Sequence, residues 1–311
     1  MNDHLLRVAD LGTADLAHLL ALASTFKADP YAHRRFLAND TVVLYFNKPS
    51  TRTRISFETA VARLGGIPIT IGPGDLQLGR GETIEDTARV VSRYARAFVI
   101  RTYADADVAR FAAAATIPVI NALTDLHHPC QALADLLTLR EKRGDLRRLR
   151  LAYVGDGNNV AHSLLEAAAL AGLSIHVATP SSFAPDPAIV AGARRCARDT
   201  GATIEVSEDP VAAVRGADAV YTDVWVSMGD PEDERAQRFA ALAPYQVNAA
   251  LMALAKPDAI FLHCLPDHRG EEVTAEVVDG ARSVVFDQAE NRLHTAVAIL
   301  FALVEQRRVH V

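Results

Sequence analysis

The chain has 311 residues, of which 50% are hydrophobic and 23% charged, and its formal net charge at pH 7 is -6. No apolar run reaches the roughly 18 residues of a membrane span, and the acidic balance argues against general binding of nucleic acid or anionic membranes. This length predicts about two domains, each able to bury its own core.

The cysteines and the first residues suggest a compartment. The start, MNDHLLRVAD, lacks the basic flank and apolar core of a signal peptide. Cys130, Cys196 and Cys264 are widely spaced and odd in number, which disfavours a disulfide framework and fits a reducing cytoplasm. We therefore expect a soluble, cytoplasmic protein. Only four of the 32 basic residues are lysine, so an arginine within a motif carries less weight here.

Apolar runs of strand length alternate with helix-length amphipathic segments along most of the chain. This pattern predicts βαβ units and the α/β class, with a mainly parallel sheet flanked by helices in each domain. The predicted strands are Thr41–Phe46, Ala97–Arg101, Leu149–Gly155, Ser174–Thr179, Asp218–Val224 and Ala259–Leu265. The basic stretch Arg140–Arg150 separates two such series, which places the domains at 1–143 and 144–289. From its pattern alone the last helix, within 290–311, fits either domain, and we assign it to the first.

The segment Phe46–Gly66 sets three hydroxyls and two arginines directly before a predicted helix. One face of that helix is formed by Phe57, Ala60, Val61 and Leu64. Ser50 stands where an N-cap belongs, so the helix N-terminus can hold a phosphate together with Arg52. The alternative is that Ser50 only caps the helix while Arg52 and Arg54 are solvated. A Walker A loop is absent, which favours a small phosphate over a nucleoside triphosphate.

A second strand, turn and helix lies in LAYVGDGNNVAHSLLEAA. Gly155 and Gly157 match two glycines of the dinucleotide fingerprint, but Val160 stands where the third belongs, so NAD binding is disfavoured. Asn158 and Asn159 follow the strand, where open α/β sheets bind polar ligands. Turn formation and helix capping explain these two residues equally well.

An acidic loop follows the strand at Asp218–Val224. It offers the carboxylate of Asp223 and then the run Ser227-Met228-Gly229. A carboxylate at a strand end suits a cationic amine. On local grounds a plain acidic loop is the stronger interpretation.

Two histidine segments raise the question of zinc. His127 and His128 precede Pro129, which favours the first turn of a helix, and His263 and Cys264 end a buried strand. Zinc is disfavoured because HExxH and paired C-x-x-C spacings are absent and because neighbours on a strand point to opposite faces. A neutral histidine that donates to an oxyanion needs only reach and the right tautomer.

Taken together, these motifs resemble those of the transcarbamylase family over essentially the whole chain. The run Ser50–Arg54 looks like its carbamoyl-phosphate signature, and His128–Gln131 looks like its HPxQ element. Asp223 with Ser227–Gly229, and His263–Pro266, look like features of its ornithine-specific members. Four ordered motifs are far more specific than any one of them.

The resemblance implies an activity and an assembly. The carbamoyl group of carbamoyl phosphate would pass to the δ-amine of L-ornithine, which gives L-citrulline and phosphate in arginine metabolism, without a metal or other cofactor. Residues 1–143 would bind carbamoyl phosphate and residues 144–289 would bind L-ornithine, with helices joining the two domains. A homotrimer or a multiple of trimers is implied, with active sites between subunits.

The resemblance also implies roles for individual residues. The residues implied to hold carbamoyl phosphate are Ser50, Thr51, Arg52, Thr53, Arg101, His128, Gln131 and, from a neighbouring subunit, Gln77. The residues implied to close this site are Cys264, Leu265 and Arg292, and those implied to bind ornithine are Asn159, Asp223, Ser227 and Met228. Arg101, His128 and Thr53 would stabilise charge on the carbonyl oxygen, and Arg52 would stabilise charge on the phosphate. Cys264 with Asp223 would accept the proton of the amine.

Two departures and three alternatives accompany the resemblance. Asp267 replaces the usual small residue after HCLP, which puts the charge near the closing loop in doubt, and Cys130 occupies the variable place of HPxQ. The first alternative is a relative that uses aspartate, putrescine or an N-acylated ornithine. The second is a non-catalytic anion-binding module, and the third is a zinc hydrolase.

Overall fold

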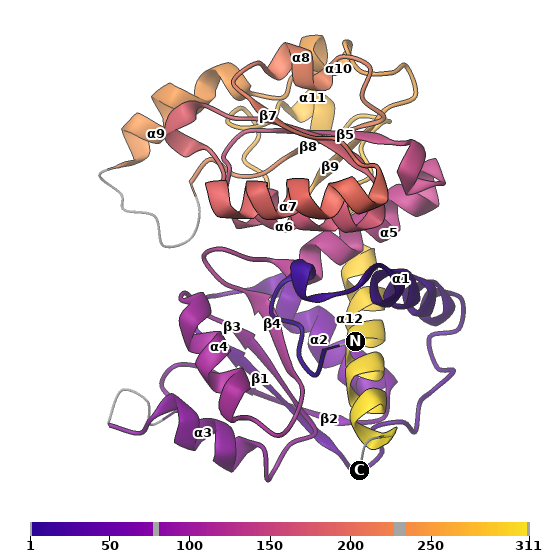
Figure 1. The fold of residues 1–311 in the computed structure, drawn as a ribbon, viewed down its shortest axis with the longest axis vertical. Helices are drawn as coiled ribbons and strands as arrows, with labels where there is room; N and C mark the ends of the chain where they lie inside the picture. The colour runs from indigo at the N-terminus through magenta and orange to yellow at the C-terminus, as the bar shows by residue number, and fades with distance from the viewer. Residues whose placement is uncertain (1, 77–80, 227–233, 310–311) are drawn as a thin grey trace. The chain divides into compact units, whose positions relative to one another are not determined.

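The computed structural model describes residues 2–76, 81–226 and 234–309. The chain forms two compact units, one made of residues 1–137 and 290–311 and the other of residues 138–289. Each unit contains a parallel sheet flanked by helices (Figure 1), which confirms the predicted α/β class.

The sheet of the first unit has four parallel strands in the order β2-β1-β3-β4. Their bounds are β1, Thr41–Phe46; β2, Ile67–Ile71; β3, Ala97–Arg101; and β4, Val119–Leu123. The predictions of β1 and β3 are confirmed to the residue. The prediction missed β2 and β4, because Pro68 and Asn121 interrupt their apolar runs.

The helices of the first unit lie on both faces of its sheet (Figure 1). Their bounds are η1, Val8–Asp10; α1, Thr13–Ala28; α2, Thr51–Arg63; α3, Ile84–Val91; α4, Asp105–Ala114; α5, Pro129–Arg143; and α12, Val285–Val309. Of these, α5 and α12 also contribute residues to the second unit. One core joins β3 to α4, where the rings of Phe98 and Phe111 stack with centroids 4.1 Å apart.

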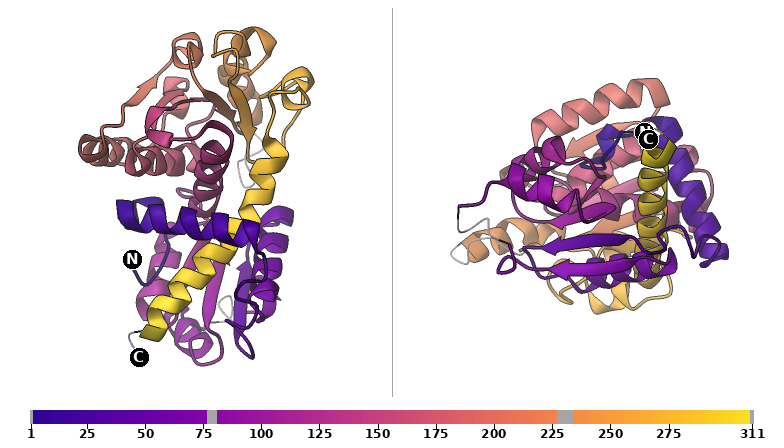
Figure 2. Two further views of the ribbon diagram at one scale, coloured as in Figure 1. Left: turned by 90° about the vertical axis from the view of Figure 1, so that its right-hand side faces the viewer. Right: turned by 90° about the horizontal axis from the view of Figure 1, so that it is seen from below.

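Figure 2 shows that α12 runs along the first unit and that α1 crosses α12. The rings of Phe26 on α1 and Phe301 on α12 meet edge to face, with centroids 5.5 Å apart. Lys27 of α1 also donates to Asn291 of α12 across 2.8 Å. Within this unit the chain's last helix is therefore held by both apolar and polar contacts.

The sheet of the second unit has five parallel strands in the order β7-β6-β5-β8-β9. Their bounds are β5, Arg150–Val154; β6, Ser174–Ala178; β7, Ile204–Ser207; β8, Ala219–Thr222; and β9, Ile260–His263. Four of them lie within predicted strands. The short edge strand β7 was missed, since only two of its four residues are apolar.

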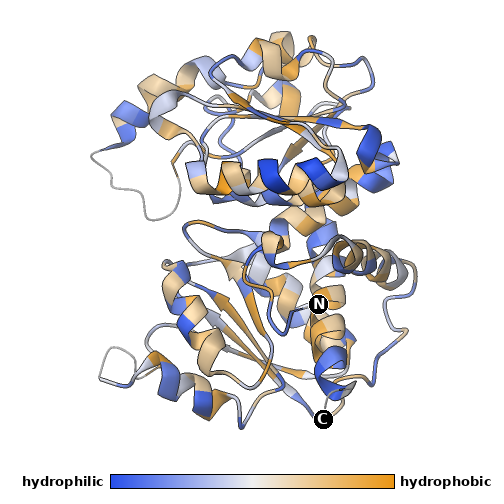
Figure 3. Cartoon of the chain, viewed as in Figure 1, coloured by the Kyte–Doolittle hydropathy of each residue, from blue (hydrophilic) through white to orange (hydrophobic). Residues whose placement is uncertain are grey.

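Helices cover both faces of this sheet as well. Their bounds are η3, Leu146–Arg148; α6, Asn159–Ala171; η4, Ser181–Phe183; α7, Pro187–Thr200; α8, Pro210–Val214; α9, Arg235–Leu242; η6, Ala243–Tyr245; α10, Ala249–Met252; and α11, Ala275–Val278. In Figure 1, α6 and α7 lie on one side, and α8, α10 and α11 lie on the other. Apolar residues predominate in most strands of both sheets (Figure 3).

The strand orders place one switch point in each sheet. In the first sheet the chain leaves β1 toward β2 and later returns on the other side of β1 as β3; in the second it does the same around β5, toward β6 and back to β8. Open α/β sheets bind ligands at the carboxyl ends of the strands that flank such a point. These ends are where the predicted functional motifs lie.

No helix among the described residues combines the length and the apolar character that crossing a membrane would demand.

Candidate active site

The first predicted site segment follows β1 and starts α2. Ser50 has an extended backbone, with φ -162°, and its hydroxyl accepts a hydrogen bond from the backbone N–H of Thr53 across 3.3 Å. The predicted N-cap is therefore confirmed. Thr51 is the first helical residue, and Thr53 is 2% exposed. The positive dipole end of this helix forms a suitable environment for an anion.

The two arginines of this segment have different surroundings. Arg54 points into an ion pair with Glu58 at 2.9 Å, and Glu58 also accepts from Thr70. Both partners of the pair are substantially exposed, so Arg54 is solvated as the alternative interpretation expected. Arg52, in contrast, is close enough to His128 to act on its pKa.

A buried imidazole lies among three guanidinium groups at the carboxyl end of the first sheet. His128 is 5% exposed, and Arg101, the last residue of β3, is 8% exposed. Burial, and then the positive charges of Arg292, Arg101 and Arg52, hold the pKa of His128 well below its ordinary value. The imidazole is therefore neutral near pH 7, while its surroundings carry several positive charges.

Arg292 on α12 joins two of the predicted binding residues. Its Nη1 donates to Oε1 of Gln131 across 2.5 Å, and its Nη2 donates to the hydroxyl of Thr53 across 3.1 Å. Nε2 of Gln131 in turn donates to Oδ1 of Asp135 across 2.8 Å. Each of these side chains is at most 4% exposed, so a buried polar network connects α2, α5 and α12.

The loop that precedes His128 is fixed by one carboxylate. Asp105 accepts from Nδ1 of His127 at 2.7 Å, from the hydroxyl of Thr124 at 2.7 Å and from the backbone N–H of Leu126 at 3.1 Å. Although burial opposes it, the hydrogen bonds from His127 and Thr124 keep the pKa of Asp105 below its ordinary value. His127 is thus a structural residue.

A second ion pair supports the same loop. Nζ of Lys48, which precedes the Ser50 segment, lies 2.6 Å from Oδ1 of Asp125 and 4.1 Å from the ring centre of Tyr103. The backbone N–H of Asp125 donates to the carbonyl of Tyr103 as well. These contacts connect the loop after β1 with the loop after β4.

In the second unit, Asn158 and Asp223 meet at the switch point between β5 and β8. Oδ1 of Asn158 accepts from the backbone N–H groups of Val160 and Ala161, and its Nδ2 donates to Oδ2 of Asp223 across 2.8 Å. Asn158 is therefore the N-cap of α6, and Asn159 is the first residue of that helix. Asp223 is only 5% exposed.

Cys264 completes the environment of this carboxylate. Its Sγ donates to Oδ1 of Asp223 across 2.9 Å, so the two oxygens of Asp223 face different partners. The phenol of Tyr153 lies nearby; burial, and then the charges of Asp223, Asp156 and Cys264, raise its pKa well above the ordinary value. Tyr153 therefore stays protonated, and it donates to the carbonyl of Asp156 across 2.8 Å.

The two glycines after β5 are required by the local backbone. Gly155 has φ +137°, a conformation that L side chains rarely adopt. A Cβ on Gly157 would come within 2.5 Å of the carbonyl oxygen of Phe183 and within 2.4 Å of the nitrogen of Pro185. The close approach of the neighbouring loop explains Gly157.

His263 makes two hydrogen bonds that fix its tautomer. Its Nδ1 accepts from the backbone N–H of Leu265 across 2.9 Å, so the proton belongs on Nε2, which lies 3.2 Å from Oε1 of the fully buried Glu272. Glu272 also accepts from the backbone N–H of His268. Leu265 has φ +58°, and this network holds the strained turn next to Cys264.

One expectation about this segment was wrong. Strand alternation was expected to separate His263 from Cys264, but β9 ends at His263 and the alternation stops there. One ligand atom each from Asp223, His263 and Cys264 lies within 4.8 Å of the others. A second group of this kind is His268, Glu271 and Glu272. Both ring nitrogens of His263 already have hydrogen-bond partners, so this arrangement does not need an ion to explain it.

Two family models match nearly the whole chain. Residues 3–141 match the model of the carbamoyl-P binding domain of aspartate/ornithine carbamoyltransferases, and residues 147–303 match the model of their Asp/Orn binding domain. The chain belongs to the aspartate/ornithine carbamoyltransferase family.

Individual members of the family are similar over nearly the full length. The chain is 54% identical over 302 residues to the ornithine carbamoyltransferase of Acidothermus cellulolyticus, a match that covers 97% of this chain and 96% of that protein. Against the ornithine carbamoyltransferase of Mycolicibacterium paratuberculosis the identity is 51% over 305 residues, with 98% of both chains covered. The solved ornithine carbamoyltransferase of Pyrococcus furiosus superposes with a TM-score of 0.92 at 49% identity, covering 96% of this chain and 95% of that one.

Several residues implied by the family resemblance lie outside the part of the chain that the structure describes. These are Gln77, Ser227 and Met228. Asp267, which departs from the family pattern, is described. Its carboxylate lies 2.9 Å from Arg269, which also pairs with Asp279 at 2.7 Å, so the additional negative charge is compensated locally.

The sequence patterns did not identify four residues whose side chains hold the predicted site residues or their neighbours in place. They are Asp105, Asp135, Asn158 as the partner of Asp223, and Glu272. Each is a polar side chain whose partner is distant in the sequence or is fixed only by the packed fold. A polar residue inside an otherwise apolar helical run, such as Asp135 within α5, was the one available signal.

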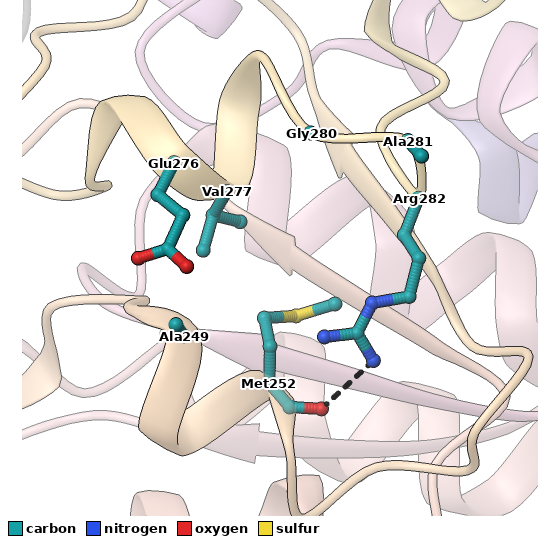
Figure 4. A pocket seen from close by; sticks show the side chains of 7 residues that line it. All are labelled: Ala249, Met252, Glu276, Val277, Gly280, Ala281 and Arg282. Carbon is teal, nitrogen blue, oxygen red and sulfur yellow. Dashed lines mark hydrogen bonds between the residues drawn. The ribbon is translucent and has the colours of Figure 1, made fainter.

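A hollow elsewhere in the second unit contains none of the predicted residues. It has a volume of about 200 Å³ and lies between α10 and α11 (Figure 4). Glu276 and Arg282 border it over the apolar side chains of Met252 and Val277, and Arg282 donates to the carbonyl of Met252 across 3.2 Å. That guanidinium is engaged in holding the backbone of α10.

Proposed function

We propose that this chain transfers the carbamoyl group of carbamoyl phosphate to the δ-amine of L-ornithine, with L-citrulline and phosphate as products. Membership of the family supports carbamoyl transfer, and relatives 54% and 51% identical are named ornithine carbamoyltransferases. The observation that carries the choice of amine is the buried carboxylate of Asp223 in contact with the thiol of Cys264. A carboxylate suits a cationic substrate, and the thiol adds a proton acceptor.

The phosphate end of carbamoyl phosphate would bind at the start of α2. Ser50, Thr51 and Thr53 supply hydroxyl and backbone donors there, and Arg52 supplies the matching charge. As the C–O bond to phosphate breaks, negative charge collects on the leaving group. Arg52 would stabilise that charge, and one such preorganised donor is worth about 3 to 4 kcal/mol in the transition state.

The carbamoyl carbonyl would accept from Arg101 and His128. Negative charge develops on this oxygen when the amine attacks the carbon. His128 can donate to it as a neutral imidazole, since its lowered pKa keeps the ring uncharged near pH 7. Its role is thus that of a fixed dipole, while Arg101 contributes full charge. Gln131 and Arg292 would hold the remaining part of the group.

The δ-amine must lose a proton before it can attack, because its pKa in water lies near that of lysine, about 10.4. The hydrogen bond from Cys264 to Asp223 provides a route for that proton. As Sγ receives the first amine proton, the thiol proton passes to Asp223, and the neutral nitrogen forms its bond to the carbamoyl carbon. The C–O bond to phosphate then breaks, and a second proton from this nitrogen leaves with the phosphate as hydrogen phosphate. Asn159, Ser227 and Met228 would hold the α-amino-acid end of ornithine, and Leu265 would contact the carbamoyl group.

We also propose that the chain assembles as a homotrimer or a multiple of trimers, with Gln77 reaching a neighbouring active site. The edge strand β2 exposes Ile67 and Ile69, and Ile55 on α2 is exposed as well. An apolar sheet edge is a surface that subunit contact would bury. Cys130, Cys196 and Cys264, all among the described residues, form no disulfide, which fits the cytoplasm that we propose as its compartment.

A citrulline assay tests the proposed reaction. Purified chain is supplied with carbamoyl phosphate and, in separate reactions, ornithine, aspartate, putrescine or N-acetylornithine. We expect carbamoylation of ornithine at least tenfold faster than of the other amines. Faster carbamoylation of another amine would reassign the substrate, and carbamoyl phosphate binding without any turnover would support the non-catalytic module. Sedimentation should give a mass that is a multiple of three chains of 33.5 kDa.

A further inference from the structure

The amide of Gln131 is held in one orientation by two buried partners. Its Oε1 accepts from Arg292 across 2.5 Å, and its Nε2 donates to Oδ1 of Asp135 across 2.8 Å. A guanidinium can only donate, so the amide oxygen has to face Arg292, and the amide nitrogen therefore faces Asp135. If the amide were flipped, its Nε2 would face the guanidinium of Arg292, and two hydrogen-bond donors would oppose each other.

This network is buried, so a wrong orientation would be costly. Gln131 is 1% exposed, Asp135 is 0% exposed and Arg292 is 4% exposed. Water therefore cannot replace a lost partner at this place without a change in the packing. An unpaired donor or acceptor in such an interior carries its full desolvation cost. Gln131 and Asp135 are also one turn apart on α5, which keeps their separation constant.

The oxygen of this amide faces the side where the phosphate segment lies. Arg292 donates at the same time to Thr53, on the first turn of α2. A carbonyl oxygen has two lone pairs, and the guanidinium of Arg292 uses one of them. The second can accept from another donor on that side.

We propose that Asp135 is a positioning residue that keeps Oε1 of Gln131 directed at the carbamoyl group, where it accepts a hydrogen bond from the carbamoyl N–H. This proposal rests on the proposed binding of carbamoyl phosphate. It explains how the site would distinguish carbamoyl phosphate from other acyl phosphates. Arg101 and His128 would contact the carbonyl oxygen, which every acyl phosphate has. Only the carbamoyl group also carries an N–H, and acetyl phosphate presents a methyl group in its place.

The test compares the affinities of three probes by titration calorimetry in the absence of ornithine. The probes are carbamoyl phosphate, acetyl phosphate and inorganic phosphate. We expect the wild-type chain to bind carbamoyl phosphate at least tenfold more tightly than acetyl phosphate, the ratio expected when one hydrogen bond in a buried site is lost. Equal affinities for the two acyl phosphates in the wild-type chain would overturn the inference without any variant.

Two substitutions of Asp135 separate positioning from stability. Asp135→Ala removes the acceptor for Nε2 of Gln131, and we expect the preference for carbamoyl over acetyl phosphate to fall at least fivefold while the affinity for inorganic phosphate changes less than twofold. Asp135→Asn keeps an oxygen at the same place and should preserve the preference within about threefold. If the role of Asp135 were merely structural, Asp135→Ala would lower the affinity for all three probes together, and that result would also overturn the inference.

A double-mutant cycle shows whether Asp135 acts through Gln131. Gln131→Met has a similar volume and no polar atoms to orient. If the proposal is right, adding Asp135→Ala to Gln131→Met causes no further loss of the preference between the two acyl phosphates. Additive losses would contradict it. These binding ratios do not depend on turnover, so a failed citrulline assay would refute the proposed reaction while leaving this inference to its own result.

Discussion

Cys264 and Asp223 follow neighbouring strands, and the thiol of Cys264 donates to Oδ1 of Asp223 across 2.9 Å. Their proximity is set by backbone register, because Thr222, the last residue of β8, pairs with His263, the last residue of β9. The next residue of each strand therefore emerges at the same place on the carboxyl edge of the sheet. Two motifs that are about forty residues apart in the sequence are thereby brought into contact at one sheet edge.

This relationship leads to a prediction for Cys264→Ser. Serine keeps a hydrogen bond to Asp223, so the free energy of unfolding should change by less than about 1 kcal/mol. A hydroxyl is a far weaker acid than a thiol and releases its proton to Asp223 less readily, so kcat for citrulline formation should fall on the order of 10 to 100-fold, the range of general acid–base effects. Steady-state kinetics from pH 6 to pH 9.5 measure this. Equal turnover by both proteins at every pH would rule out proton transfer through Cys264.

Asn158 and Asn159 should give different mutational effects. Asn158→Ala removes the N-cap of α6 and the contact with Asp223, so it should cost about 1 to 2 kcal/mol of stability and also lower kcat. Asn159→Ala removes a side chain without a capping role and should mainly raise the KM for ornithine. Urea unfolding together with kinetics separates the two variants. Loss of stability in Asn159→Ala alone would reverse the assignment.

Sequence patterns predicted the strands that are buried and unbroken. In β1, the run TVVLYF has four consecutive buried residues, and its bounds were predicted to the residue. In β4, Asn121 interrupts the run, yet it is 1% exposed and donates to the carbonyl of Leu6. A polar residue can stand in a buried strand when a tertiary partner is available, and such a partner is not visible in a local pattern.

The same reason separates the predicted site residues from the missed ones. Ser50 was predictable because capping depends on the residues immediately before and after it. The contact between Asn158 and Asp223 depends on the pairing of β5 with β8, and the contact between Arg292 and Gln131 depends on how α12 packs. Spacing places residues on an element, but it does not say which side chains from distant elements will meet.

Arg52 and Arg54 form a matched pair for testing the phosphate assignment. Arg52→Ala should lower kcat/KM about 100 to 1000-fold, because a donor to the leaving group is lost in the transition state. Arg54 forms an ion pair with Glu58 in which its own side chain is 56% exposed, so Arg54→Ala should keep kcat/KM within about threefold. Kinetics with carbamoyl phosphate as the varied substrate measure both. Near wild-type values for Arg52→Ala would refute its role.

The lowered pKa of His128 predicts a pH dependence of stability with a definite sign. In the unfolded chain this histidine titrates near its ordinary pKa, about 6.5, whereas burial and then Arg292, Arg101 and Arg52 keep it neutral in the folded chain. Below about pH 6.5 the unfolded state therefore binds a proton that the folded state does not. The free energy of unfolding falls by up to about 1.4 kcal/mol per pH unit as the pH decreases through this range, until the folded pKa is reached.

His128→Asn isolates this contribution. Urea unfolding of both proteins at pH 7.5 and pH 5.5, at one protein concentration, gives two differences in stability. The wild-type difference should exceed that of the variant by about 1.4 kcal/mol, since the lowered pKa values of His4, His176 and His294 contribute equally to both proteins and cancel. Equal differences would mean that the folded chain also protonates His128 by pH 5.5. The imidazole would then be a cation in acid, and carbamoyl phosphate binding would have to depend on pH through His128.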